Sequence, residues 1–227
     1  MLFQDRFDAG RLLASKLRPF ANPADTVVLA LPRGGVPVGF EVAKTLHVPL
    51  DVFVVRKLGV PGQEELAMGA IASGGICVLN EDLVRALGIP YEVINAVAAD
   101  EERELERREH LYREGRPAVA VKGRTVILVD DGLATGSSMR VATMALKRKN
   151  PAQIVVAVPV GAPAACVEIE SEVDQIICVV TPERFQSVGE WYRDFSQTSD
   201  EEVRDLLRRA GAFPENDGPA IRGLHGD

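Results

Sequence analysis

Cysteine and long apolar runs are both scarce in this 227-residue sequence. The three cysteines, Cys77, Cys166 and Cys178, are too few and too scattered for a disulfide framework or a CxxC metal or redox site. We therefore expect buried free thiols and a cytoplasmic location. No apolar stretch approaches the roughly 20 residues that span a bilayer, so we expect no membrane partner. Asp5 and Asp8 stand where a signal or transit peptide avoids acids, and the first residues suit an amphipathic helix instead.

Positive charge is also in deficit. The chain has 26 Lys and Arg against 33 Asp and Glu, a formal net charge of −7. This balance provides no broad attraction for nucleic acid, so an anionic ligand has to be bound by a local site. With 46% hydrophobic and 26% charged residues, the composition is typical of a globular α/β protein. The length allows one sizeable core with a small addition.

Five short apolar runs rich in β-branched residues indicate strands. Runs without polar alternation are typical of parallel strands that are covered on both faces. They lie at 26–31, 50–55, 125–130, 153–158 and 175–180. Helix-compatible stretches separate them, at 36–47, 137–149 and 162–171. The order predicts an α/β fold with a doubly wound parallel sheet flanked by helices, whose ligands bind at the carboxyl ends of the strands.

One segment, 81–117, interrupts this alternation. It begins with a short helical pattern and continues as a long charged helix at 91–115 with one apolar stripe. Two pairs at i,i+4 spacing support that helix, Glu104 with Arg108 and Glu109 with Arg113. We interpret the segment as a helical insertion with one buried face.

The domain organisation follows from these segments. We predict a single domain over residues 1–210 that includes the insertion. The aromatic segment 182–198, which follows the last predicted strand, is a candidate hood over the sheet edge. Residues 211–227 are predicted to be a flexible tail.

The stretch VILVDDGLATGSS, residues 126–138, carries the strongest functional signal. An apolar strand delivers Asp130 and Asp131 to the carboxyl edge of the sheet, and a turn of small residues then enters a helix. The backbone N–H groups of the turn, the helix N-terminus and the Thr and Ser hydroxyls form a cradle for a phosphate dianion. Carboxylates repel phosphate, so we expect the two acids to face sugar hydroxyls or positive charge that develops on a sugar.

Three other kinds of site are excluded, because the sequence lacks a residue that each motif requires. A Walker A loop needs a lysine after its last glycine, but Ser137 follows Gly136. Neither this stretch nor RGGVPVG at 33–39 has the GxGxxG spacing of a dinucleotide-binding fold. An aspartyl phosphatase needs an acid two positions after the first aspartate, where Gly132 stands. A polar turn without a ligand stays open as the structural alternative.

VILVDDGLATGSS resembles the thirteen-residue signature of the type I phosphoribosyltransferases: four apolar residues, two acids and a small-residue loop with Thr-Gly. LPRGGVPVG and VRKLGVPG extend the resemblance over most of residues 1–200, and they are similar to those of bacterial phosphoribosyltransferase-domain proteins of uncharacterised activity. The resemblance implies that Asp130 and Asp131 bind the ribose 2- and 3-hydroxyls of phosphoribosyl diphosphate. The residues implied to hold its 5-phosphate are Ala134, Thr135, Gly136, Ser137 and Ser138.

LPRGG, residues 31–35, follows the first predicted strand. The paired glycines, Gly34 and Gly35, expose backbone N–H groups, and Arg33 offers a planar donor fork for phosphate oxygens. A turn with a solvated arginine is the alternative. The family resemblance implies a diphosphate-binding loop here, often with a cis peptide.

VRKLGVPG, residues 55–62, brings Arg56 and Lys57 to the end of the second predicted strand. We favour both as diphosphate contacts, with ordinary strand-end charges as the alternative. The glycines and proline that follow predict a mobile loop. The resemblance implies that such a loop closes over the diphosphate and excludes water.

Recognition of an acceptor base falls to the aromatic segment. Phe185 is the first choice, because an aromatic face stacks on any planar base, whereas Trp191 and Phe195 suit a structural cluster equally well. The 6-oxopurine phosphoribosyltransferases resemble one another in having an aspartate at the position of Ala134, and DDGLATG looks like the adenine-type loop instead. The three histidines lie outside all these motifs, which argues against histidine acid catalysis.

These features predict the transfer of phosphoribose from phosphoribosyl diphosphate to a nitrogen acceptor, in the first instance a nucleobase, with release of pyrophosphate. The predicted catalytic residues are Asp130, Asp131, Arg33 and Lys57. Mg²⁺ is the implied cofactor, bound through substrate and water with no direct protein ligand. A non-catalytic phosphoribosyl diphosphate sensor or regulator is the alternative, and hydrolysis of a phosphosugar is a third. The resemblance also implies a homodimer.

Overall fold

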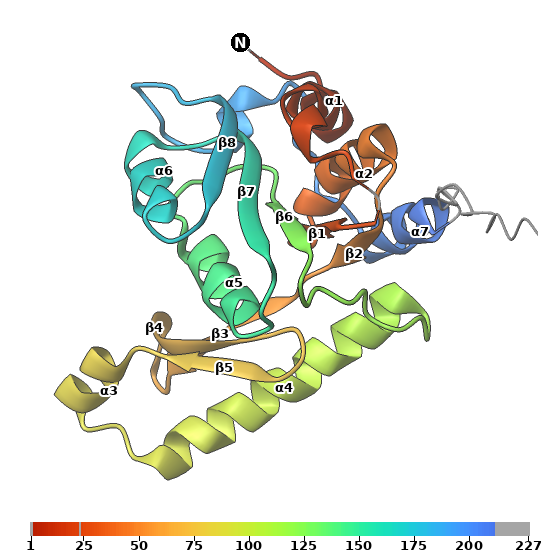
Figure 1. Ribbon diagram of the computed structural model, residues 1–227. Helices are drawn as coiled ribbons and strands as arrows, with labels where there is room; N and C mark the ends of the chain where they lie inside the picture. The colour runs from red at the N-terminus through yellow and green to blue at the C-terminus, as the bar shows by residue number, and fades with distance from the viewer. Residues whose placement is uncertain (1, 23, 212–227) are drawn as a thin grey trace, which may run out of the picture.

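A five-stranded parallel sheet forms the centre of the computed structural model, which describes residues 2–22 and 24–211 (Figure 1). The strands, in spatial order, are β2 (Leu50–Val52), β1 (Thr26–Ala30), β6 (Thr125–Val129), β7 (Gln153–Val160) and β8 (Gln175–Val180). The predicted parallel sheet is therefore confirmed, although the run at 50–55 leaves it at Val52. The predicted tail lies outside the described residues from residue 212 on.

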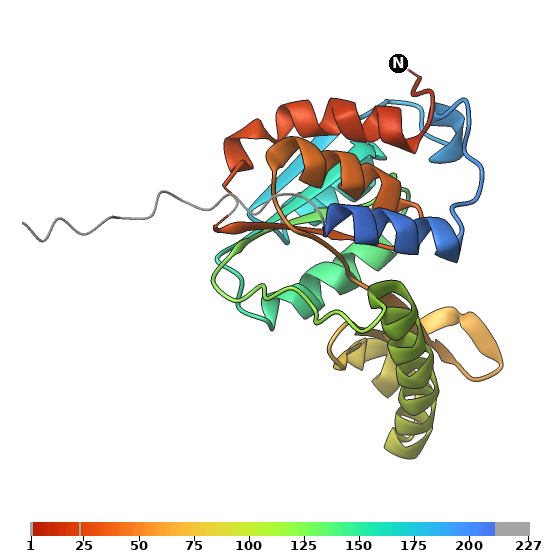
Figure 2. The ribbon, with the colours of Figure 1, turned by 90° about the vertical axis from the view of Figure 1, so that its right-hand side faces the viewer.

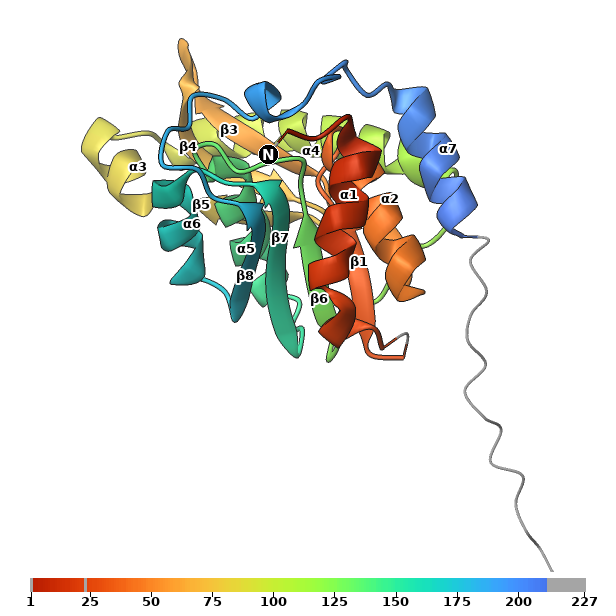
Figure 3. The same ribbon diagram turned by 90° about the horizontal axis from the view of Figure 1, so that it is seen from above.

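Helices cover both faces of this sheet (Figures 1 and 3). On one side lie α1 (Arg6–Lys16), α2 (Gly35–Leu46) and α7 (Asp200–Ala210), and on the other α5 (Ser137–Lys147) and α6 (Pro163–Glu170). Two short 3₁₀ turns are η1 (Arg18–Phe20) and η2 (Gly189–Trp191). Successive strand residues enter two separate cores: Val28 packs with the α2 side, whereas Val27 packs with the α5 side. Burial on both faces explains the continuous apolar runs in the sequence.

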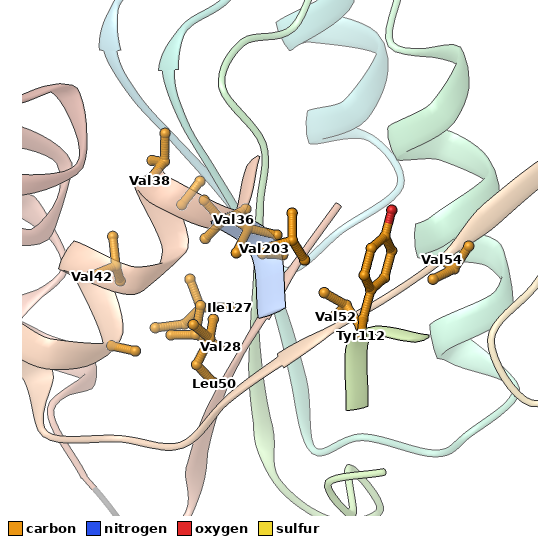
Figure 4. Close-up of a cluster of buried hydrophobic side chains, with 14 of the residues drawn as sticks. Val28, Val36, Val38, Val42, Leu50, Val52, Val54, Tyr112, Ile127 and Val203 are labelled. Carbon is orange, nitrogen blue, oxygen red and sulfur yellow. The ribbon is translucent and has the colours of Figure 1, made fainter. Parts of the chain in front are cut away.

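The first core holds β1 and α2 together (Figure 4). Val28 and Ile127 of the strands pack with Val36 and Val42 of α2, and Val203 of α7 belongs to the same cluster. Burial of each such side chain contributes about 1.5–3 kcal/mol to the free energy of folding. The burial of both elements fixes the loop that joins them, residues 31–34.

A small antiparallel sheet extends from the main body, together with the longest helix (Figure 2). It comprises β3 (Val55–Val60), β4 (Gln63–Ala72) and β5 (Ile76–Leu79). The expectation of a loop after Lys57 was therefore wrong in secondary structure. Pro61 and Gly62, which has φ +79°, form the turn between paired strands, and Leu58 and Met68 are fully buried in the first core. The polar residues at 63–65 concealed this strand pair in the sequence.

The long charged helix is confirmed as α4 (Tyr91–Arg113), preceded by α3 (Glu81–Leu87). Its stripe is buried at Ile94, Leu105 and Tyr112. Both predicted ion pairs form, with N–O distances of 2.8 Å for Arg108–Glu104 and 2.9 Å for Arg113–Glu109. How far this segment, the candidate hood and residues 1–210 form one domain stays a prediction.

The cysteines are free, but the expectation that they are buried was wrong, since all three are only half-buried. Cys166 and Cys178 nevertheless meet, with their sulfur atoms 3.4 Å apart, a proximity that their spacing did not indicate. Among the described helices, none combines the length and the apolar character needed to cross a membrane.

Candidate functional site

Three chain segments meet at the carboxyl ends of β1, β6 and β7. Leu31 after β1 donates its N–H to the Val129 carbonyl at 2.9 Å, and Leu133 after β6 donates to the Val160 carbonyl at 2.9 Å. The segment after β8 reaches the start of the chain through a bridge between Phe3 and Tyr192, beside the N-terminal end of α1 (Figure 1). The structure thus brings the 31–35 and 130–138 loops to one edge, as parallel strands require.

The two predicted loops are in direct contact. A Cβ atom on Gly34 would lie 2.0 Å from Asp131 Oδ2, and one on Gly35 would lie 2.8 Å from the Val129 carbonyl oxygen. Only glycine fits so close to the acid pair. The peptide bond between Pro32 and Arg33 is cis, as the family resemblance implied.

The acid pair carries more negative charge than its surroundings stabilise. The pKa of Asp130 is raised well above its ordinary value, because burial disfavours the carboxylate and the charge of Asp131 lies beside it. Burial also raises the pKa of Asp131, while the guanidinium of Arg6 acts in the opposite direction. Asp130 Oδ1 accepts the N–H of Asp131 at 2.8 Å, which fixes the first carboxylate beside the backbone.

Two residues near the acids were missed by sequence reasoning. Arg6, the first residue of α1, donates from Nε to Asp131 Oδ2 at 2.8 Å. The Tyr192 hydroxyl donates to the backbone carbonyl of Asp131. No local motif marks either contact, since Arg6 and Asp131 are 125 positions apart.

The small-residue loop enters α5 at Gly136, whose φ of +74° favours glycine. Gly136 is buried against α6, whereas Ala134 and Ser138 are exposed. The Thr135 and Ser137 hydroxyls lie 3.1 Å apart, and the Thr135 hydroxyl accepts the Ser137 N–H at 3.4 Å. The N-cap position itself, Gly136, provides no side-chain cap. The first-turn N–H groups of α5 and these hydroxyls form the arrangement expected for binding an anion.

The predicted basic residues have different surroundings. Arg33, about 36% exposed, lies 3.7 Å from Asp200 at the start of α7. Asp200 in turn accepts the hydroxyl of Tyr112 at 2.7 Å, and burial is the main cause that raises the pKa of Tyr112 to about 12. These contacts connect the 31–35 loop to α4 and α7.

Arg56 and Lys57 point to opposite faces of β3 because they are adjacent in the strand. Arg56 contacts Glu101 of α4 at 2.6 Å, so its guanidinium is already paired within the fold. Lys57 is exposed on the other face, where its neighbour Val55 packs with the α5 core. The role of both residues toward a diphosphate stays a prediction.

Phe185 packs against a small third core that contains Phe3 and Tyr192. Trp191 packs against the same core, whereas Phe195 remains 37% exposed. The candidate base contact, Phe185, is thus partly packed, whereas Phe195 is the more exposed ring. The contact of Phe185 with a base stays a prediction.

Comparison with known proteins assigns the family. The phosphoribosyl transferase domain profile matches residues 61–193. MT0597 of Mycobacterium tuberculosis, named as a candidate phosphoribosyl transferase, is 47% identical over 209 residues, 92% of this chain and 47% of MT0597. The chain thus spans about half the length of the curated relatives it matches. The crystal structure of TT1426 from Thermus thermophilus is 42% identical with a TM-score of 0.82, covering 92% of this chain and 99% of TT1426.

The profile match includes the acid pair after β6, and MT0597 and TT1426 each match over 92% of this chain. This chain belongs to the phosphoribosyl transferase domain family, with a type I phosphoribosyltransferase-like fold.

Proposed function

We propose that this chain transfers phosphoribose from phosphoribosyl diphosphate to a nitrogen acceptor and releases pyrophosphate. The observation that carries the proposal is the contact between Gly34 and Asp131, which joins a glycine-rich loop to the acid pair at one sheet edge. A substrate with a diphosphate on one side of a sugar and a phosphate on the other needs two anion-binding loops with acids between them. The sequence order of the two loops around Asp130 and Asp131 supports that arrangement.

The acid pair would act on the sugar. As pyrophosphate leaves, the anomeric carbon gains positive charge, and the carboxylates of Asp130 and Asp131 favour that charge while they accept the ribose hydroxyls. Such preorganised electrostatic stabilisation is often the largest contribution to catalysis. The loop from Ala134 to Ser138 would hold the 5-phosphate through the N-terminus of α5 and its hydroxyls.

The leaving diphosphate would lie against the 31–35 loop. The N–H groups of Gly34 and Gly35 and the side chains of Arg33 and Lys57 would offset its charge. Bound Mg²⁺ neutralises phosphate oxygens and prefers hard oxygen ligands and water, so we propose that it binds through the substrate. The described residues contain no cluster of three His, Cys, Asp or Glu that could hold a metal ion.

The acceptor would enter beneath the 182–198 segment, the proposed hood. Aromatic faces in this segment support a planar base as the acceptor, with Phe185 as the first candidate. The free thiols fit a reducing compartment, so the cytoplasm is the proposed location.

A phosphoribosyl diphosphate sensor is the second candidate. Its support is the contact of Arg56 with Glu101, which removes one predicted cation from the diphosphate site. The same loops can bind without turnover, because a fold does not fix a reaction.

Pyrophosphate release separates these functions. The assay uses phosphoribosyl diphosphate and Mg²⁺ with a panel of purine and pyrimidine bases, a no-base control, and Asp131→Asn in parallel. We expect base-dependent release that falls about 10²–10³-fold in the variant, the typical effect of losing one preorganised interaction. Binding without release for any base would favour the sensor, and release without a base would favour hydrolysis.

A further inference from the structure

The start of α1 reaches into the acid pair. Arg6 Nε lies 2.8 Å from Asp131 Oδ2, and the two side chains are only 11% and 16% exposed. A hydrogen-bonded ion pair with so little exposure is stronger than a surface salt bridge, because water screens it less. Arg6 therefore binds one carboxylate oxygen of Asp131, the acid that we assign to sugar binding.

The Arg6 guanidinium is itself held in place. Nη1 donates to the Ser196 carbonyl at 2.7 Å, and the guanidinium carbon lies 4.0 Å from the centre of the Phe195 ring. At the start of the same helix, the Asp5 carboxylate caps α1 by accepting the Asp8 N–H at 2.7 Å. Contacts from the hood segment and a capped helix thus fix the direction of the donor, which lowers the entropy lost in holding the acid.

Asp131 has a reason to need this cation. Asp130 adds a negative charge on the same loop, and Tyr192 presents a neutral phenol, whose pKa is raised mainly by burial. On the facing 31–35 loop, the charged group is Arg33, which is directed to Asp200 at 3.7 Å. Arg6 is therefore the cation that directly contacts Asp131 within the described structure.

We propose that Arg6 is a positioning residue, which orients Asp131 and keeps it ionised so that the carboxylate can accept a ribose hydroxyl. Arg6 binds Oδ2 and leaves Oδ1 for the sugar. The inference rests on the proposed function, and it adds the α1 helix to the machinery of the site. It also makes sugar binding depend on the hood segment, because Ser196 and Phe195 hold the same guanidinium.

The test follows the carboxylate directly. Carbon-13 NMR titration of the aspartate carboxyl groups is recorded for the wild type, Arg6→Met, Arg6→Lys and Arg11→Met, with Asp131→Asn to assign the signal. Arg11 is the matched control, since it lies on the same helix but is 55% exposed and pairs with Asp8. The affinity for phosphoribosyl diphosphate with Mg²⁺ is measured by calorimetry over the same pH range, and unfolding temperatures check the fold.

We expect the Asp131 midpoint to rise by about 1–3 pH units in Arg6→Met, the usual size of an adjacent arginine's effect. Affinity at neutral pH should fall roughly ten- to a hundredfold, as for loss of a hydrogen bond to a charged group. The pH below which binding is lost should move upward with the midpoint. Arg6→Lys should restore part of both effects, and Arg11→Met should match the wild type.

Two results would overturn the inference. An unchanged Asp131 midpoint in folded Arg6→Met would show that Arg6 does not keep the acid ionised. A raised midpoint with unchanged affinity across the pH range would show that ionisation does not matter for the sugar. Failure of the wild type to bind phosphoribosyl diphosphate would instead refute the proposed function, and the titration would still decide whether Arg6 governs Asp131.

Discussion

Arg113 and Arg6 each hold a largely buried aspartate, but the two aspartates differ in their other donors. Asp51 on β2 accepts Arg113 Nε at 3.0 Å and 3.1 Å, the Val52 N–H at 2.8 Å and the Val119 N–H at 3.0 Å. Within the described structure, the donor from another element that reaches the Asp131 carboxylate is Arg6 Nε, at 2.8 Å. One acid is saturated by the fold, whereas the other has acceptor capacity to spare.

The difference separates a structural ion pair from a candidate binding pair. Asp51 and Arg113 tie the end of α4 to the main sheet, and a ligand could not add to them. Asp131 lies beside a second acid, and the like charges of the two carboxylates repel each other. The fold alone does not require this energetic cost. Perturbed acids of this kind concentrate at functional sites.

Removal of each acid should distinguish the structural ion pair from the candidate binding pair most clearly. Asp51→Ala leaves Arg113 Nε and two backbone N–H groups without their acceptor, while Glu109 still pairs with the guanidinium. Because each buried donor left unsatisfied costs about 1–3 kcal/mol, the free energy of unfolding should fall by about 3–5 kcal/mol. Asp131→Ala should lower the free energy of unfolding much less, because fewer donors from the rest of the fold hold the Asp131 carboxylate. Urea denaturation of both variants measures this, and a larger loss for Asp131→Ala would reverse the assignment.

The contact between the loops predicts the next largest effect. Gly34 has φ −59° and ψ −32°, which any residue adopts, so Gly34→Ala acts through space. The added Cβ would lie 2.0 Å from Asp131 Oδ2 and 3.2 Å from Arg6 Nε, so it would displace the carboxylate and crowd its cation. Displacing that carboxylate should lower turnover on the order of 10²-fold. Steady-state kinetics would measure the loss, with the unfolding temperature as a control. Normal turnover would mean that the position of Asp131 is not critical.

Arg56 and Lys57 extend the same comparison to two adjacent cations. Arg56 already has Glu101, whereas Lys57 is exposed and available to a ligand. Lys57→Met should therefore weaken the binding of phosphoribosyl diphosphate roughly tenfold, and Arg56→Met should weaken it less. Equal losses in calorimetry would show that Arg56 leaves Glu101 to contact the ligand.

The smallest effect concerns the charge of Asp130. Because its pKa is raised in the folded state, the folded chain binds a proton that the unfolded chain releases, and stability falls as pH rises above the ordinary aspartate value. Asp130→Asn removes this cost and keeps an oxygen to accept the Asp131 N–H. We expect the unfolding temperature near pH 7 to rise by about 2–4 °C while activity falls. A drop in that temperature would show that the charge of Asp130 stabilises the fold.

The sequence predicted the parts of the site that lie within single motifs. The five parallel strands, the acid pair after β6 and the loop after β1 follow from local patterns, because strand ends and glycine turns are local features. Their meeting at one edge follows from parallel topology.

Contacts between distant segments could not be read in this way. Arg6 was one charge on an amphipathic helix, and nothing near it in the sequence indicates Asp131. The β3–β4 pair was concealed for a different reason. Its turn carries glycine and proline and its first residues are polar, so the pattern resembled a loop until burial against α4 was visible.

The most direct test of the account is calorimetric titration of phosphoribosyl diphosphate with Mg²⁺ into the wild type and Asp131→Asn. We expect the wild type to bind and the variant to bind at least about tenfold more weakly, with little change in unfolding temperature. Equal affinity of the two proteins, or no binding by the wild type, would contradict it.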